Sequence, residues 1–503
     1  MGRIAVIGAG MGAMAAAARL AVAGHRVVVY ERTETYGGAV RRLERDGFAF
    51  DTGPGLLLLP AVYRDLFVKT GRQPLEECVE LVQVDPSSRH VFADGTEVSL
   101  PNASRAGVLA ALDDALGAGA GQRWGDFLVR AREAWDRTRR PLLEEPLWPN
   151  WRVLAEREPY PAVPHRRLLR ARRAGTLDEV GAWELRDARL AALLDGYALA
   201  YGLDPRTAPA SASVLPYMEY AFGTWHVRGG LRRLAAAVYE RCLERKVEFV
   251  FGAEVARVLE KDGRAAGVEL ADGTVAEADT VVGGAPGRLG RLLPGREPYE
   301  GNAVRPAAEG ASPGRVVVCL ALRGPRAEGA AHRTVVHTPD REAEWEALRR
   351  GEPPARPTVR IDRPDDPALR PDDAHESVVL TATVPSGASF DWTAPGVAGA
   401  FADRMVAAAE RAVPSLAGRI LWREVRTPAD TERETGAAGG GVPAPALAAG
   451  AGAFLRPANT TALSGLFAVG GWSHPGGGLP HAGMSGALVA GLVVEGPEFR
   501  GSQ

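Results

Sequence analysis

The chain has 503 residues, a formal net charge of −2, 46% hydrophobic residues and 24% charged residues, which is typical of a globular protein with two or three lobes. This near-neutral charge excludes the large basic field that general nucleic-acid binding requires, so we expect no nucleic-acid partner. Cys78, Cys242 and Cys319 have neither metal-ligand nor redox spacing. We therefore expect no metal site and a reducing compartment.

The apolar run at residues 4–7 is too short for a secretory signal, since glycines follow it at once. No apolar run reaches the roughly 18 residues that a membrane span needs. We therefore expect a cytoplasmic protein, either soluble or in peripheral contact with a membrane.

Residues 3–32 have the pattern of a strand, a helix and a second strand. Residues 4–7 form an apolar run typical of a buried parallel strand. Residues 11–22 are rich in alanine and predict a helix, and residues 27–30 predict the second strand. The arrangement is that of a dinucleotide-binding unit.

The turn between the first strand and the helix carries small residues with separate roles. Gly8 permits a tight turn, Gly10 lets a pyrophosphate approach the backbone, and Ala13 permits close packing of helix on strand. Glu31 ends the second strand, where a carboxylate accepts hydrogen bonds from an adenosine ribose. The predicted nucleotide-binding residues of this unit are Gly8, Gly10, Gly12, Ala13, Glu31 and Arg32.

A second glycine cluster indicates that the cofactor is FAD and not NAD. Gly37 and Gly38 follow the unit, and residues 48–55 contain Gly53 and Pro54. An NAD dehydrogenase does not need this second cluster. In an FAD enzyme, such glycines let the backbone pass close to the bound diphosphate or ribityl chain. We find one dinucleotide unit and no cysteine or histidine in a known flavinylation context, so we expect one non-covalent FAD.

These motifs and three later ones resemble the phytoene desaturase family of flavoproteins, which includes the carotenoid desaturases. The matching positions are Gly8, Gly10, Glu31, Gly37, Gly38, Asp51, Gly53 and Pro54, followed by residues 222–238, 247–285 and 454–486. The resemblance implies that the backbone of Val255 meets the adenine. It also implies that the closing motif contacts the flavin through Gly470, Gly471, Gly478, Leu479 and Pro480.

The closing motif also predicts a helix beginning near Gly483, whose N–H groups point at the flavin ring. Some positions depart from the family. Ala39 stands where the family usually has arginine, and we expect Arg41 or Arg42 to compensate. Gly55 replaces a common serine. Trp472 and His481 are bulkier than usual beside the flavin, which leaves the natural substrate open.

The predicted fold class is α/β, with a Rossmann-like FAD-binding domain that is discontinuous in sequence and a substrate domain that combines a mixed sheet with helices. The FAD-binding domain is expected from residues 1–70, 222–290 and 455–503, and the substrate domain from residues 71–221 and 291–454. Strands are predicted at residues 315–323, 333–338, 357–361 and 377–385, mostly helical structure at 104–200, a helix at 399–413, and a loop beside the active site or on the surface at 436–452.

A basic run at residues 165–173 follows Trp148 and Trp151. Two interpretations are open: a solvated helix face, or a contact with an anionic membrane through arginines and interfacial aromatic side chains.

Dehydrogenation of a carbon–carbon bond on FAD needs a hydride acceptor and a route for the proton, but no protein nucleophile. The candidate acid or base groups are His474, His226 and His481, for which a purely structural role is the alternative. Amine oxidases of this fold often carry a lysine near the flavin, and the lysines here are Lys69, Lys246 and Lys261, the last two in turn-like surroundings.

Three functions compete. The first is a desaturase of a carotenoid, another polyene or another apolar substrate, with oxygen or a quinone as the diffusible electron acceptor. The second is another enzyme of the same fold: an isomerase or saturase, an amine oxidase, or a dehydrogenase of a smaller secondary metabolite. The third is a non-enzymatic binding protein. The identity of the substrate and the oligomeric state are open.

Overall fold

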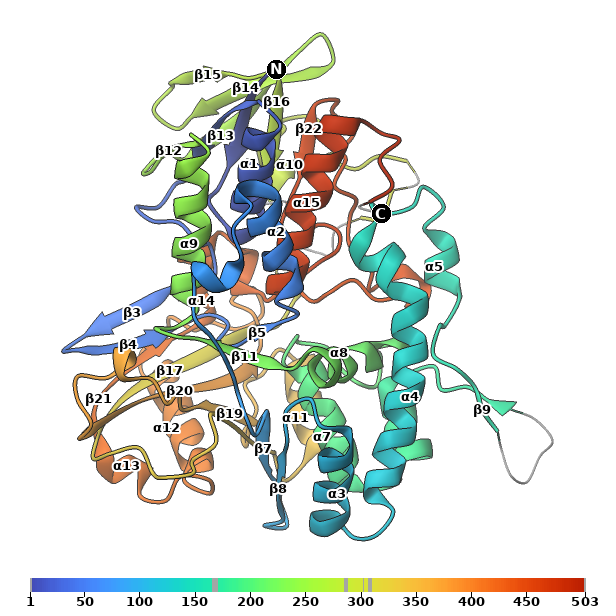
Figure 1. Cartoon of the computed structure of the whole chain (residues 1–503), viewed down its shortest axis with the longest axis vertical. Helices are drawn as coiled ribbons and strands as arrows, with labels where there is room; N and C mark the ends of the chain where they lie inside the picture. Colours follow the sequence, from blue (N-terminus) through green and yellow to red (C-terminus); the bar gives the residue numbers. More distant parts are fainter. Residues whose placement is uncertain (1, 165–170, 285–287, 302, 306–309, 502–503) are drawn as a thin grey trace.

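A five-stranded parallel sheet forms the centre of the upper half of the molecule (Figure 1). The computed structural model describes residues 2–164, 171–284, 288–301, 303–305 and 310–501. Distant parts of the chain supply the strands, each parallel to its neighbour, in the order β12, β2, β1, β16, β22. Their bounds are β1 (Arg3–Ile7), β2 (Arg26–Tyr30), β12 (Glu248–Val250), β16 (Thr280–Gly283) and β22 (Leu466–Ala468).

Both faces of this sheet are covered, which is why β1 is continuously apolar. Ile4 and Val6 pack on one side with helices α1 (Met11–Val22), α2 (Ala61–Gly71), α9 (Leu231–Glu244) and α15 (Leu479–Glu495). Ala5 and Ile7 pack on the other side with the antiparallel strands β13 (Val255–Lys261), β14 (Arg264–Leu270) and β15 (Val275–Glu277), which form a separate three-stranded sheet. The predicted α/β class is confirmed.

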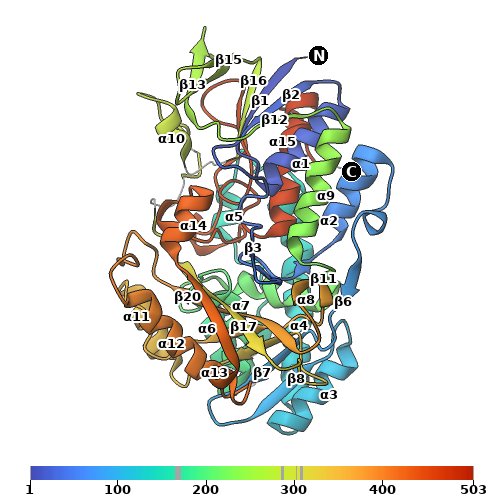
Figure 2. The same cartoon turned by 90° about the vertical axis from the view of Figure 1, so that its left-hand side faces the viewer.

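A seven-stranded mixed sheet spans the lower half, in the order β21, β17, β20, β19, β18, β7, β8 (Figures 1 and 2). Neighbours are antiparallel except β18 and β7. The strands are β7 (Ser88–Val91), β8 (Glu97–Leu100), β17 (Gly314–Arg323), β18 (Arg333–Val336), β19 (Val359–Asp362), β20 (His375–Val384) and β21 (Ile420–Arg426). The four strands predicted between residues 315 and 385 are thereby confirmed, with small shifts at their ends.

One face of this sheet is covered by α12 (Val397–Ala409), whose apolar side chains pack on alternate strand residues such as Val318 and Leu380. Helices α11 (Arg341–Arg349) and α13 (Leu416–Arg419) complete the lower edge in Figure 2. Helix α12 ends at Ala409, four residues before the predicted end at residue 413. On the opposite face, Cys319, Ala321 and Val379 pack against Phe48 and Phe50, and another part of this face is turned to the interior of the molecule.

Helices fill the space beside the sheet and share one apolar core that includes Leu112, Trp124 and Leu193. They are α3 (Arg105–Leu116), α4 (Ala120–Arg139), α6 (Leu177–Val180), α7 (Ala188–Leu199) and α8 (Val214–Phe222), with α5 (Arg152–Glu156) at the side of the molecule. The mostly helical structure predicted for residues 104–200 is confirmed. In the part of the chain that the structure describes, no helix is long and apolar enough to cross a bilayer.

Shorter elements join the two halves. Strand β11 (Thr224–Val227) pairs antiparallel with β5 (Leu57–Leu58) and β6 (Leu81–Gln83). The remaining elements are β3 (Arg42–Arg45), β4 (Phe48–Asp51), β9 (Val163–Pro164), β10 (Ala171–Arg172), α10 (Leu289–Leu292) and α14 (Pro428–Thr435). How the chain divides into domains stays a prediction.

Asp51 ties two of the sequence motifs together. Its carboxylate accepts hydrogen bonds from the backbone N–H groups of Leu231 at 2.7 Å and Arg232 at 3.3 Å, at the start of α9. Gly230 precedes that helix with a φ of +87°, and a Cβ placed on it would lie 2.8 Å from Asp51 Oδ2. The glycine pair at residues 229–230 is therefore needed to bring the helix onto this carboxylate.

The Asp51 cap predicts an unusual dependence of stability on pH. Burial raises the pKa of the Asp51 carboxyl to about 6 from its ordinary 3.8, although the backbone N–H groups oppose the shift. A pKa raised by folding contributes stability that is complete below the unfolded pKa and is lost as the pH rises through the folded pKa. We expect the melting temperature of the native protein, relative to Asp51→Asn, to fall as the pH rises through about 6.

The matched variant Asp51→Ala leaves the N–H groups of α9 without this acceptor, so it should be less stable than Asp51→Asn by about 1 kcal/mol. A constant difference in melting temperature between the native protein and Asp51→Asn across this pH range would contradict the assignment.

Candidate active site

Gly8 and Gly10 shape the turn between β1 and α1. Gly8 has a φ of +87°, and its N–H donates to the carbonyl of Tyr30 at 2.8 Å. Gly10 immediately precedes α1, and a Cβ placed on it would meet no atom within 4 Å. Gly10 lines a large cavity, so the free N–H groups at the start of α1 lie at the wall of that cavity.

Gly12 and Ala13 have packing roles in the same turn. A Cβ on Gly12 would lie 2.8 Å from the carbonyl oxygen of Ala482 in α15 and 3.0 Å from Cα of Gly470. The methyl group of Ala13 lies 3.0 Å from the position of a Cβ on Gly284, directly after β16. Small residues here bring α1, α15 and the sheet together, as the spacing predicts for Ala13.

Glu31 holds the end of β2 against the turn. Its Oε2 accepts the N–H of Ala9 at 2.8 Å, and its Oε1 accepts both the N–H and the hydroxyl of Thr33 at 2.8 Å. A carboxylate has roughly four acceptor positions, so capacity for a ribose hydroxyl remains. Val255, at the start of β13, is buried with Ile7. The contacts of Glu31 with a ribose and of Val255 with an adenine stay predictions.

The three arginines that follow β2 in the chain, Arg32, Arg41 and Arg42, make different contacts. Arg32 donates to the backbone carbonyls of Glu432 and Arg433 near the end of α14. Arg42 donates to the carbonyl of Gly229 at 3.0 Å, whereas Arg41 lines the cavity and donates to the carbonyl of Gly38 at 2.9 Å. Arg41 is therefore the arginine placed to compensate for Ala39.

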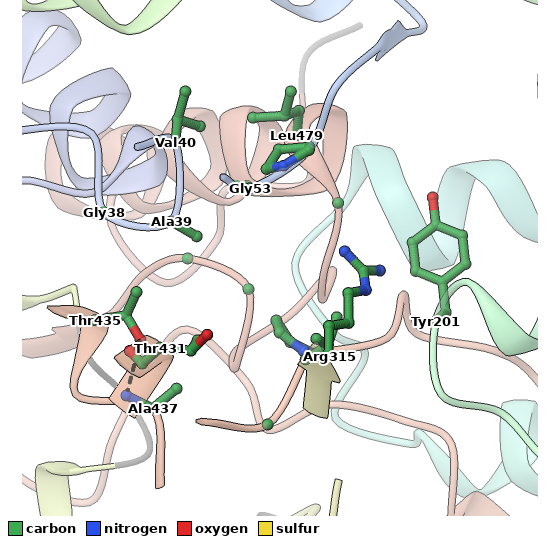
Figure 3. Close-up of a pocket in the computed structure, with 18 of the residues that line it drawn as sticks. Gly38, Ala39, Val40, Gly53, Tyr201, Arg315, Thr431, Thr435, Ala437 and Leu479 are labelled. Atoms are coloured by element: carbon green, nitrogen blue, oxygen red, sulfur yellow. Dashed lines mark hydrogen bonds between the residues drawn. The ribbon is translucent and has the colours of Figure 1, made fainter. Parts of the chain in front are cut away.

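The cavity has a volume of about 600 Å³ and lies between the two halves of the molecule (Figure 3). Of the predicted cofactor residues, those that line it are Gly10, Gly12, Ala13, Gly37, Gly38, Gly53, Pro54, Gly470, Gly471, Gly478, Leu479 and Pro480. Gly8, Glu31, Arg32 and Val255 lie outside its wall. Residues of the 436–452 loop, Gly436, Ala437, Gly441 and Val442 among them, also line it, as the first of the two interpretations of this loop predicts.

Helix α15 begins at Leu479, four residues earlier than expected. Gly478 precedes it with a φ of +103°, and Pro480 is tolerated because a proline in the first turn of a helix removes no intrahelical hydrogen bond. The cavity wall therefore includes the very start of this helix.

Part of the inner face of the seven-stranded sheet forms the opposite wall. Alternate residues of a strand point to the same face, so four of its strands contribute two side chains each, spaced two residues apart. These are Ser88 and His90 from β7, Arg315 and Val317 from β17, Arg333 and Val335 from β18, and Arg360 and Asp362 from β19.

Two ion pairs occur among these side chains. Arg333 pairs with Glu219 of α8, which also accepts the Tyr197 hydroxyl at 3.3 Å. Arg360 donates to Asp362 at 2.9 Å. Sequence reasoning missed these residues, although charged and apolar side chains alternate in β19. That alternation ordinarily indicates a solvent-facing strand, and only the tertiary structure turns the polar face inward.

Comparison with known proteins identifies the family. Residues 14–494 match the model of the flavin-containing amine oxidoreductases. The hydroxyneurosporene desaturase of Rhodobacter capsulatus is 31% identical, covering 97% of this chain and 96% of that protein. The 4,4'-diapolycopene oxygenase of Methylomonas is 29% identical, covering 98% of both chains.

The chain belongs to the flavin-containing amine oxidoreductase family. The resemblance to the carotenoid desaturases is confirmed by these relatives. A solved oxidoreductase from Methanosarcina mazei has the same fold, with a TM-score of 0.65 at 18% identity, covering 97% of this chain and 99% of that one. The protein is therefore an FAD-dependent oxidoreductase.

The cavity of this flavin-containing oxidoreductase fits the cofactor. Glycines from three motifs form one wall, and nothing fills the space over Gly10, where a pyrophosphate would approach the start of α1. Gly10, Gly38 and Arg41 would hold the pyrophosphate, and Gly470 and Gly471 would lie along the ribityl chain. Leu479 would present the start of α15 to the ring.

The three candidate catalytic histidines lie outside the cavity wall. His226 is buried on β11 and its Nε2 lies 2.8 Å from Asp366 Oδ2. His474 is fully buried, with its Nε2 2.9 Å from the carbonyl oxygen of Glu145. His481 lies in α15 and is buried beside the cavity residue Ala482. Of the two side chains that are bulkier than is usual in the family, Trp472 and His481, only Trp472 lines the cavity. All three histidines have packing or hydrogen-bonding positions rather than contact with the reaction space.

Substitutions of Gly10 and Gly12 should have separate effects, one on cofactor binding and the other on folding. In Gly10→Ala the new methyl group enters open cavity space, so the protein should keep its melting temperature while its FAD affinity falls by about tenfold or more. In Gly12→Ala the methyl group meets the Ala482 carbonyl, which should cost about 1–3 kcal/mol of unfolding free energy. Thermal denaturation and FAD titration of the apoprotein measure the two effects.

Gly399→Ala in α12 is the matched control, because a Cβ there also meets nothing within 4 Å. It should leave FAD affinity intact and raise the unfolding free energy by at most about 1 kcal/mol, because alanine is favoured over glycine in a helix. Unchanged FAD affinity in Gly10→Ala would place the pyrophosphate elsewhere.

The buried histidines predict sensitivity to acid. Burial lowers the pKa of His474 and of His481 to about 4, from 6.5 in the unfolded chain. A pKa lowered by folding contributes stability that is present above the unfolded pKa and is lost as the pH falls through the folded pKa. The melting temperature should therefore fall between about pH 6.5 and 4, and His481→Leu should reduce this fall.

The control for this prediction is His375→Gln, which removes a partly exposed histidine that lies 2.6 Å from Asp372. An acid sensitivity that is the same in the native protein, His481→Leu and His375→Gln would show that buried histidines are not its source.

Proposed function

We propose that the protein is a dehydrogenase that introduces carbon–carbon double bonds into a polyene or a similarly apolar chain. The observation that carries the proposal is the continuity of the cavity, which joins the glycine wall to the face of the seven-stranded sheet. A flavin on the first wall would face a substrate held against the second. The desaturase name of the hydroxyneurosporene relative supports this reaction class.

Apolar side chains along the cavity support a hydrocarbon chain as substrate. They include Leu56, Leu58, Val317, Val335 and Trp472. Such a lining excludes water from the reacting carbons and binds a chain without hydrogen-bonding groups.

When bound, the flavin supplies the acceptor for the hydride that leaves one carbon. The neighbouring carbon loses a proton to solvent or to a base, and the electrons of that C–H bond form the new double bond. The start of α15 would stabilise the negative charge that the flavin ring gains on reduction, because unsatisfied N–H groups lie at a helix N-terminus. The sheet wall positions the chain, and no protein nucleophile is required.

An amine oxidase is the weaker alternative. Lys69, Lys246 and Lys261 are all exposed, and none of them lines the cavity. The lysine that often serves amine oxidases of this fold therefore has no counterpart beside this site.

We also propose that electrons leave the reduced enzyme to oxygen or a quinone, and that the protein is cytoplasmic with a peripheral membrane contact. Residues 165–170 of the basic run lie outside the described residues. Trp148 and Val153, exposed at 37% and 47%, support an interfacial contact near α5. Binding to anionic vesicles that weakens with added salt would support it.

The proposed reaction predicts that oxidised flavin is the working form at the start of turnover. Mixing the oxidised holoenzyme with phytoene or hydroxyneurosporene without oxygen should bleach the flavin and form one double bond per flavin. Absorbance and mass spectrometry follow the two changes. Turnover only after reduction with dithionite, with substrate mass unchanged, would show isomerisation and reject desaturation.

A further inference from the structure

Arg315 is an arginine on the sheet wall of the cavity that has no carboxylate partner within the described residues. Its guanidinium donates to the backbone carbonyl of Ala200, and its remaining N–H groups have no protein acceptor there. Arg333 and Arg360 on the same wall are each paired with a carboxylate. The wall formed by these three arginines with Glu219 and Asp362 therefore carries one positive charge in excess.

This excess positive charge costs free energy, because the guanidinium of Arg315 is largely removed from water. Burial, with a further contribution from Arg360, lowers the pKa of Arg315 to about 10, so the side chain is still cationic at neutral pH. A buried cation is stable when a ligand or a partner neutralises it, and a guanidinium offers five donors in a planar fork that matches a carboxylate.

Tyr201 adds a second donor beside this arginine. It follows Ala200, whose carbonyl receives Arg315, and both side chains line the cavity (Figure 3). Burial raises the pKa of the Tyr201 hydroxyl, so it keeps its proton. The hydroxyl lies 3.7 Å from the position of a Cβ on Gly478, at the start of α15. Arg315 and Tyr201 thus lie together at the same end of the cavity as α15.

We propose that Arg315 and Tyr201 bind a carboxylate at one end of the polyene substrate. This inference rests on the proposed function and specifies its substrate class: a polyene acid rather than an unsubstituted hydrocarbon. The apolar side chains hold the chain, and the arginine and tyrosine hold its oxygen atoms. The guanidinium sets which part of the chain lies opposite the flavin, so these two are specificity-determining residues.

Besides Arg315, the cavity arginines Arg41 and Arg456 have no carboxylate ion pair in the described chain; Arg41 donates to the carbonyls of Gly38 and Glu434. Arg456 donates through its Nε to the carbonyl of Ala444 at 2.9 Å. It belongs to the closing motif and lies on the flavin side, whereas Arg315 projects from the sheet. A carbonyl of the flavin ring or a free anion would also accept hydrogen bonds from Arg315. The experiment therefore distinguishes these two acceptors from a substrate carboxylate.

The test compares all-trans-retinoic acid with its methyl ester, which has the same chain without the negative charge. Isothermal titration of the FAD-loaded protein measures both dissociation constants. The acid should bind about tenfold more tightly than the ester. Arg315→Met should abolish this preference, Arg315→Lys should keep part of it, and Tyr201→Phe should reduce it. Arg323→Met, at the exposed end of the same strand, is the matched control and should retain it.

Equal binding of acid and ester by the native protein would reject the carboxylate inference and leave the polyene dehydrogenase in place. Binding of neither would also reject the carboxylate inference, whereas the anaerobic reaction with phytoene decides the proposed function separately. A preference that survives in Arg315→Met would also reject the assignment, as would displacement of the acid by acetate at equal concentration, which would show a free-anion site. A loss of FAD from Arg315→Met as severe as that from Glu31→Gln would assign Arg315 to the flavin instead.

Discussion

The close contact of α1 with α15 is the constraint on which the site depends. A Cβ on Gly486 would lie 2.6 Å from the carbonyl oxygen of Gly12, and one on Gly12 would lie 2.8 Å from that of Ala482. The two helices therefore meet backbone to backbone, which only residues without side chains allow. Because they meet, the first turn of the chain and its closing motif form one glycine wall.

The cavity exists because a second sheet faces this wall. Its outer face is closed by α12, and the part of its inner face that Phe48 and Phe50 do not cover lines the cavity. Asp51 helps to hold the two halves in register, since it ends β4 and caps α9. The chemistry of electron acceptance resides in the cofactor, so the choice of substrate falls to the sheet and to the helices that flank it.

The sheet wall is more polar than an apolar substrate requires. Arg333 and Arg360 are partly buried and paired with acidic side chains, and such pairs gain little net stability over well-packed apolar residues. Their position at the face of a cavity favours a role in recognition over a role in folding.

The sequence by itself determined the cofactor wall. Glycine spacing, the apolar first strand and the acidic end of the second strand each follow from local geometry, so they identify Gly10, Gly38 and the closing motif without knowledge of distant contacts. Four strands of the mixed sheet, β17 to β20, were also predicted from the sequence, whereas β7, β8 and β21 were not. Local patterns are sufficient here because a dinucleotide turn is built from consecutive residues.

The tertiary structure alone decided what faces the flavin. His474 and His481 lie within the closing motif, yet they are buried away from the cavity, because helical and turn geometry sends neighbouring residues to different sides. Arg315, Arg333 and Arg360 come from three separate strands and converge only through the pairing of the sheet. Strand alternation shows that one face is polar, but it does not show whether that face meets water or a substrate; the packing of distant segments decides this.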